Sequence, residues 1–308
     1  MGMISRHEYR GGVWVDLEQP TEEEIREIVQ EFSISKQFEK ELVSPTPSPL
    51  VAAGDDSVLL VLHFPAHGPE DGATVNQEID FIIGKRFIVT VRYEVVAPLY
   101  HLKKLLEAQE LVNGKDSITT DVLLEVLFAH LYTAVRDHAD HAVDGMARVE
   151  RDMFDGRERA AVRSISIINR EFLHIEALLA NQEEPLDRFL KTLVEHGSFG
   201  PSFVERGDRI RAERAQVARL ITTHRAIAAE LRRTNMALLE VRQSEIMKTL
   251  TVITVIVLPL ELMAFIFGMH LPGTPFEGNP NAFLIVMALM FGAVGLLALF
   301  FARKRWIF

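Results

Sequence analysis

The sequence contains no cysteine among its 308 residues. Disulfides, thiolate zinc sites and cysteine nucleophiles are therefore excluded, and the composition is compatible with a reducing compartment. The first residues, MGMISRHEYRGG, lack the apolar core of a signal peptide, so we expect no exported or cleaved leader. Hydrophobic residues make up 48% of the chain and charged residues 25%, which predicts one or two folded domains.

Catalytic motifs are also missing from the sequence. It has no G-x-G-x-x-G, G-x-S-x-G or H-E-x-x-H pattern. The run Asn113-Gly114-Lys115 is not a phosphate loop, because position 109, where the pattern needs glycine, is glutamine. We therefore expect that the protein is not an enzyme and has no cofactor.

Charge is nearly absent from two long stretches near the C-terminus. Residues 249–269 carry one formal charge, at Glu261, and residues 282–302 carry none. Each stretch has 21 residues, close to the roughly 20 that cross a hydrocarbon core as a helix. A buried hairpin of a soluble protein is the alternative, but soluble helices rarely stay apolar on all sides for so long. We therefore expect two transmembrane helices in a lipid bilayer.

Basic residues flank these stretches unevenly. Lys248 precedes the first, whereas the connecting residues 270–281 have no lysine or arginine and one acidic residue, Glu277. A basic cytoplasmic tail, residues 303–308, follows the second with Arg303, Lys304 and Arg305. The positive-inside rule then predicts a multi-pass protein of the inner or plasma membrane with both termini in the cytoplasm and residues 270–281 outside.

The charge of the remaining chain limits its partners. The whole chain has a net charge of −10. Residues 249–308 contribute +1, so residues 1–248 contribute −11. Such a surface attracts cations and repels polyanions, and we expect no nucleic-acid partner.

Residues 1–118 predict a cytoplasmic domain of mixed helices and strands. Thr21 and Glu24 form a capping box at the start of a helix, and SPTPSP at 44–49 predicts a connection because it cannot be helical. The expected strands are GGVWVDL at 11–17, VAAGDDSVLLVLHF at 51–64, EIDFIIG at 78–84 and KRFIVTVRY at 85–93, the last two joined at Gly84-Lys85.

Residues 119–206 predict a cytoplasmic helical region with a break near Gly156 and a second helix that ends at about Gln182. After HGSFGPS, residues 207–248 predict a stalk helix that continues into the first span, roughly 90 Å long at about 1.5 Å per residue. A seven-residue register indicates packing of this stalk against partner helices: Ile210, Val217, His224, Leu231 and Leu238. The overall expectation is an α+β cytoplasmic domain, a helical stalk and two C-terminal transmembrane helices.

The C-terminal part carries a resemblance to a known family. SEIMKTLTVITVIVLPLELMAFIFGMH, with the short loop, second span and basic tail that follow, resembles the pore end of CorA-type divalent cation transporters. The order of domains resembles that family along nearly the whole chain. Its signature is Gly-Met-Asn, and this sequence has Gly268 and Met269 followed by His270. The loop PGTPFEGNPNAF is more similar to the branch that includes ZntB-type zinc transporters.

This resemblance implies a funnel-shaped homopentamer whose first spans, residues 249–269, line a pore inside a ring of second spans, residues 282–302. It implies selectivity at Gly268, Met269 and His270, a polar side chain facing the pore at Ser244, and an apolar constriction at Met247, Leu250 and Leu258. The residues agree in part, because two spans cannot enclose a hydrated path and several copies must. Several of the implied pore positions share one helical face of the first span with further polar residues. This face holds Ser244, Met247, Thr251, Thr254, Leu258 and Glu261. The opposite face holds Val252, Ile256 and Met263.

Each pore residue also has a structural interpretation. Thr251 and Thr254 could bond back to their own helix, and Met247 and Leu258 could be packing residues. Glu261 departs from the uncharged residue that the family has there. Inside a span a carboxylate costs about 2.5 kcal/mol or more, so we expect it to face the pore, although snorkelling to the interface is the alternative.

Metal binding in the cytoplasmic part has two candidate places. His138 and His141, with Asp137 beside them, lie at helical spacings that could ligate a transition metal, although a solvated acidic face is the alternative. The resemblance implies a regulatory ion site near Asp208, where Arg209 and Arg211 are unfavourable neighbours.

The functional expectation is transport of a divalent cation. Mg²⁺ is expected first, with Co²⁺ and Ni²⁺ as further substrates. The alternative is a Zn²⁺ transporter of the ZntB type, which could be coupled to protons. The reason is His270, which can ligate zinc directly and titrates near neutral pH. A membrane-anchored structural or signalling protein is the other class, and the polar pore face argues against it.

Overall fold

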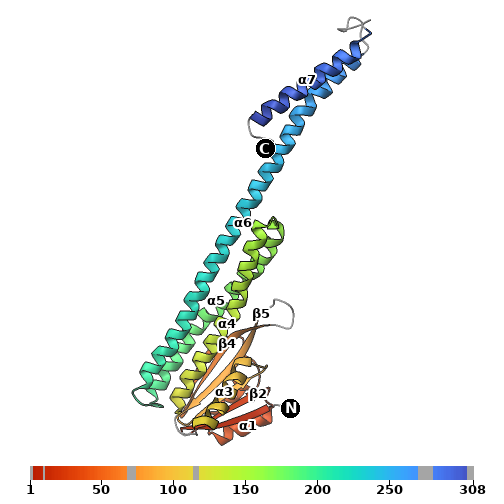
Figure 1. Ribbon diagram of the computed structural model, residues 1–308. Coiled ribbons are helices and arrows are strands. Elements are labelled where there is room, and N and C mark those ends of the chain that lie inside the picture. Colours follow the sequence, from red (N-terminus) through yellow and green to blue (C-terminus); the bar gives the residue numbers. More distant parts are fainter. Residues whose placement is uncertain (1–2, 10, 68–73, 114–117, 270–279, 304–308) are drawn as a thin grey trace. The chain divides into compact units, whose positions relative to one another are not determined.

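The structure is a computed structural model, and it describes residues 3–9, 11–67, 74–113, 118–269 and 280–303 (Figure 1). The chain forms two compact units, residues 1–232 and residues 233–308. The first unit holds the sheet and most helices, and the second holds the two apolar helices that the sequence predicts.

A six-stranded sheet is the centre of the first unit. Its strands are β1 (Met3–Tyr9), β2 (Gly12–Glu18), β3 (Leu50–Ala53), β4 (Ser57–His67), β5 (Thr74–Gly84) and β6 (Phe87–Arg92). The order is β1-β2-β6-β5-β4-β3, with β2 and β6 parallel and all other neighbours antiparallel. The other predicted strands are confirmed, but the strand expected at 51–64 is two antiparallel strands, β3 and β4, with residues 54–56 between them, and β1 was not expected.

Two short helices cover one face of the sheet. The predicted capping box starts α1 (Glu22–Glu31), because the Thr21 hydroxyl accepts from the Glu24 amide and the Glu24 carboxylate accepts from the Thr21 amide. The helix α2 (Lys36–Leu42) was not expected from the sequence. Apolar side chains of both helices share one core with the sheet: Ile25, Ile28, Val29, Phe38, Leu42, Val15, Leu17, Leu59, Val61, Ile82, Val89 and Val91.

Longer helices cover the other face: α3 (Ala97–Asn113), α4 (Thr120–Phe154) and α5 (Glu158–Glu195). Phe128 of α4 stacks on Phe81 of β5, with 5.1 Å between ring centroids. The break near Gly156 is confirmed, since this glycine has a φ of +83° between α4 and α5. The expected end of α5 at about Gln182 is wrong. The helix continues through Pro185, because Leu186, Phe189 and the apolar residues after them are buried.

The helix α6 (Phe203–Gly268) has 66 residues and is about 100 Å long at about 1.5 Å per residue. It begins before Gly207, where the stalk was expected to start. In the first unit Ile210 and Val217 are buried, and the ring of His224 stacks on Phe172 of α5 at 5.8 Å. These contacts agree with the predicted seven-residue register. The last helix is α7 (Ala282–Arg303).

Candidate ion pathway in the C-terminal helices

Two helices are long and apolar enough to cross a membrane, α6 in its C-terminal part and α7. In the most apolar 18-residue segment of each helix, 6% of the residues are buried in α6 and none are buried in α7. A soluble protein would bury such helices in its core, because each exposed apolar side chain loses about 1.5–3 kcal/mol of burial energy. Both helices also lie far from the N-terminus, so a signal sequence does not explain them. The exposed apolar surface therefore fits a lipid environment.

The seven pore-facing candidates on α6 are all exposed in the single chain: Ser244, Met247, Leu250, Thr251, Thr254, Leu258 and Glu261. On the opposite face Val252 is buried, and Ile256 and Met263 are partly buried. In the same unit Phe301 of α7 is buried as well. The polar residues therefore lie on a part of α6 that a single chain leaves exposed, together with apolar neighbours such as Ile253 and Val257.

The threonines on this face bond to their own helix. The hydroxyl of Thr251 donates to the Met247 carbonyl at 2.7 Å, and that of Thr254 donates to the Leu250 carbonyl at 2.9 Å. A hydroxyl that has donated its proton presents only lone pairs to its surroundings. Each threonine is thus an acceptor, which suits the water protons of a hydrated cation.

Glu261 differs from its neighbours because it carries a charge in an apolar helix. Its side chain is exposed, and the part of the chain that the structure describes offers it no hydrogen-bond or ion-pair partner. A carboxylate in this position needs water, a cation or a group from another molecule.

The signature residues stand at the end of α6. Gly268 is the last residue of the helix and has no left-handed φ. The amide of Met269 donates to the Phe265 carbonyl at 3.1 Å, which is a helical bond. His270 and Glu277 lie outside the described residues, as do Lys304 and Arg305, whereas Arg303 ends α7 and is exposed.

The metal candidates of the first unit do not form a metal centre among the residues that the structure describes. His138 is buried and its Nε2 lies 3.4 Å from a carboxylate oxygen of Glu171, whereas His141 is exposed and its Nδ1 contacts the Asp137 carbonyl at 3.1 Å. Asp208 accepts a hydrogen bond from Arg211 at 2.8 Å. Over the described ranges, no three side chains of His, Asp or Glu are grouped to hold an ion.

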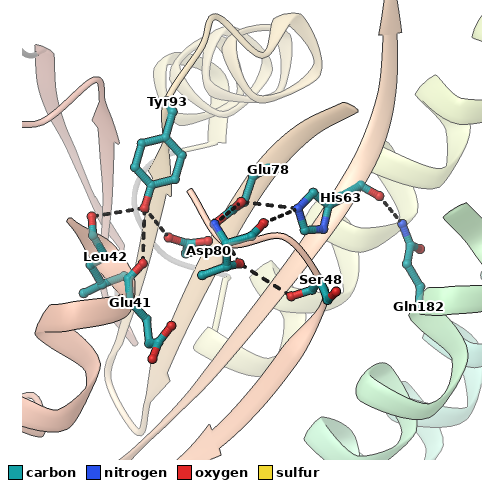
Figure 2. Close-up of polar contacts among 9 residues, drawn as sticks. Glu41, Leu42, Ser48, His63, Glu78, Asp80, Tyr93 and Gln182 are labelled. Atoms are coloured by element: carbon teal, nitrogen blue, oxygen red, sulfur yellow. Dashed lines mark hydrogen bonds and ion pairs between the residues drawn. The ribbon is translucent and has the colours of Figure 1, made fainter. Parts of the chain in front are cut away.

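Sequence reasoning missed a polar cluster inside the first unit, which Figure 2 shows. Glu78 and Asp80 on β5 are both buried, and they lie beside His63 of β4 and Tyr93. Gln182 of α5 joins this cluster to the helices, since its amide donates to the His63 carbonyl at 2.6 Å. The signal was visible in the sequence, because two carboxylates two residues apart on a buried strand share one face.

Comparison with known proteins agrees with this architecture. The model of the CorA-like Mg²⁺ transporter protein family matches residues 9–305. A cobalt/magnesium transport protein CorA of Methanocaldococcus jannaschii is 21% identical and covers 99% of this chain and 94% of its own. A magnesium transport protein CorA of Mannheimia succiniciproducens is 25% identical, over 96% of this chain and 92% of its own.

Solved structures show the same fold. The complete CorA structure from Methanocaldococcus jannaschii superposes with a TM-score of 0.82 at 20% identity, covering all of this chain and 95% of the other. The ZntB cytoplasmic domain from Vibrio parahaemolyticus is more distant, with a TM-score of 0.57 at 13% identity over 77% of this chain and 98% of the other. The soluble unit, the long helix and the two apolar helices are thus those of one fold, and the chain belongs to the family of CorA-like Mg²⁺ transporter proteins.

Proposed function

We propose that this protein carries Mg²⁺ across the inner or plasma membrane, through a pore that α6 lines in a homopentamer. Membership of the family supports a divalent cation as the substrate, and the names of the two CorA relatives support Mg²⁺ and Co²⁺. The pore-lining residues, the five-fold assembly and the cytoplasmic position of both termini are our inferences.

One observation carries the assignment of the pore to α6. Its face from Ser244 to Glu261 combines hydroxyl acceptors, apolar side chains and one carboxylate, and the single chain leaves this face exposed. The opposite face, with Val252, is covered. Copies that turn the polar face toward a common axis would surround a path with acceptors for hydrated ions and with apolar rings at Met247 and Leu258, which can close by dewetting.

The proposal is tested by uptake into liposomes that contain only this protein. Mg²⁺, Co²⁺, Ni²⁺ and Zn²⁺ are offered in turn, each with and without a proton gradient, and empty liposomes are the control. We expect uptake of Mg²⁺ that needs no proton gradient. Uptake no faster than in empty liposomes would contradict transport, and uptake of Zn²⁺ that needs the gradient would favour the ZntB-type alternative.

His270 provides a second test of the ion. Histidine has an ordinary pKa near 6.5, and a ring of imidazolium groups at an outer mouth would repel a divalent cation. We expect uptake by the native protein to fall as the external pH drops through about 6, and uptake by His270→Asn to lose this dependence. The same pH profile for both proteins would show that His270 does not control entry.

A further inference from the structure

The polar cluster in Figure 2 is built around two carboxyl groups on one face of β5. Asp80 is fully buried and Glu78 is 7% exposed. Residues 43–49 connect α2 to β3. The amide of Thr46 in this connection donates a hydrogen bond to Glu78. Two adjacent negative charges inside a protein are strongly unfavourable, so the protons of this cluster can be assigned from its hydrogen bonds.

Glu78 is surrounded by donors. The amide of Thr46 donates to its Oε2 at 2.7 Å, and the Thr46 hydroxyl lies 3.2 Å from its Oε1. Nε2 of His63 lies 3.3 Å from Oε2 and 2.9 Å from the Thr46 carbonyl, and a carbonyl can only accept, so this nitrogen carries a hydrogen. Glu78 thus accepts from the Thr46 amide, and the Thr46 hydroxyl and the Nε2 hydrogen of His63 lie close to its oxygens, although that hydrogen is nearer to the Thr46 carbonyl.

Asp80 has the opposite surroundings. Its Oδ2 lies 3.1 Å from the Tyr93 hydroxyl, and its Oδ1 has no hydrogen-bond partner among the described residues. The Tyr93 hydroxyl has one proton, yet it also lies 3.1 Å from the Leu42 carbonyl and 3.4 Å from the Glu41 carbonyl. Carbonyls only accept, so Tyr93 can bond to Leu42 and Asp80 together only if Asp80 is the donor.

The net electrostatics agree with this proton count. Burial raises the pKa of Asp80 well above its ordinary value and the negative charges of Glu78 and Glu41 raise it further, which together outweigh the lowering by the hydrogen bond with Tyr93. The pKa of His63 is raised chiefly by its hydrogen bond to Glu78, so the positive charge that this imidazole can take lies beside Glu78. The α5 side chain that joins the cluster, Gln182, is neutral.

We propose that Asp80 is a proton-binding site that latches residues 43–49 onto the sheet. With the proton bound, Asp80 is a neutral acid, and Glu78 keeps its bonds to Thr46. When the proton leaves, two carboxylates face each other with Glu41 nearby. Glu78 then turns toward water and releases Thr46, and the segment opens. The latch is closed at neutral pH and opens in an alkaline cytoplasm.

The bound proton is detected by infrared spectroscopy of the full chain in detergent. We expect the native protein at pH 7 to show the carbonyl stretch of a protonated, buried carboxyl group, and Asp80→Asn to lose this band. Asp208→Asn, which changes an exposed aspartate, should keep it. Labelling all aspartates with carboxyl ¹³C shifts the band without any substitution, so the test holds even if Asp80→Asn fails to fold. Absence of the band from the native protein at pH 7 overturns the proposal.

Opening of the latch is measured by hydrogen exchange of the Thr46 amide, which donates to Glu78 in the closed segment, corrected for the intrinsic rate at each pH. Because opening releases one proton, the open fraction should rise by up to about tenfold per pH unit between the pKa of Asp80 in the open segment and its raised pKa in the closed one, and level off above that. Asp80→Asn, which mimics the neutral acid, should keep the Thr46 amide protected throughout. An equal rise in the native protein and in Asp80→Asn would contradict the latch.

Discussion

At the scale of single residues, the apolar part of α6 mixes one carboxylate with hydroxyls that have already given their protons to the helix. Glu261 can attract a cation, whereas Thr251 and Thr254 can only accept hydrogen bonds. The two kinds of group therefore act on different properties of an arriving ion, its charge and its hydration water. Substitutions can separate these roles.

Removal of the carboxylate should weaken attraction for the ion. We expect Glu261→Ala to reduce divalent uptake severalfold with assembly intact, because a ring of negative charge in a passage of low dielectric is lost. Glu245→Ala is the matched control, since Glu245 is exposed on α6 but points away from the face with Ser244 and Glu261. The test is the rate of divalent cation uptake into liposomes. Equal uptake by the native protein and by Glu261→Ala would show that this side chain does not face the pore.

The hydroxyls can be tested without changing any charge. Thr251→Val removes an acceptor while keeping the shape of the side chain, and it should reduce uptake because hydrated ions lose a hydrogen-bond partner. Thr249→Val is the control, since the Thr249 hydroxyl bonds to the Glu245 carbonyl in the same way, at 3.0 Å, but lies on the opposite side of the helix. Equal effects of the two substitutions on uptake would contradict a pore-facing Thr251.

At the scale of elements, a cluster of ion pairs joins the start of α4 to the start of α6. Arg206 donates to Asp121 at 2.8 Å and to Glu125 at 2.7 Å, and Arg209 donates to Glu125 as well. The pKa of Glu125 is lowered, chiefly by its hydrogen bonds to Arg209 and despite an opposing effect of burial. Several charges held in one network stabilise more than an isolated surface pair.

We expect Glu125→Gln to lower the free energy of unfolding by about 1 kcal/mol, which is a fall of a few degrees in the melting temperature. Glu205→Gln, which breaks only an exposed pair with Arg209, is the control and should have little effect. A carboxylate with a lowered pKa stabilises the fold above its ordinary pKa and loses this effect as the pH falls through the lowered value. The difference between native protein and Glu125→Gln, measured by circular dichroism, should therefore shrink below about pH 4.

The sequence predicts the elements whose signals are local. The strands β4, β5 and β6 each contain a run of apolar and β-branched residues, and the capping box at Thr21 marks the start of α1. The edge strand β1 was missed because only Tyr9 of its residues is buried, so it has little apolar pattern. The end expected at about Gln182 was wrong because packing of the residues after Pro185 outweighs the hydrogen bond that this proline cannot make. Periodicity identified the exposed face of α6, whereas the partners of Thr251 and of Asp80 depend on tertiary geometry.

At the scale of the whole molecule, the protein should assemble from several copies. The exposed face of α6 and the two apolar helices leave one chain unable to surround a hydrated path. We expect the purified protein to be a pentamer when its mass is measured in a mild detergent, and to remain so in Glu261→Ala. A monomer under these conditions would contradict the proposed pore.

The order of the sheet also has a consequence for how the protein is made. The parallel pair joins β2, at residues 12–18, to β6, at residues 87–92, so the sheet can close only after β6 has left the ribosome. The first apolar stretch begins at residue 249, more than 150 residues later, which at about 5–20 residues per second is roughly ten to thirty seconds of synthesis. The six strands, with α1 and α2, therefore have time to pair and pack before either membrane helix exists.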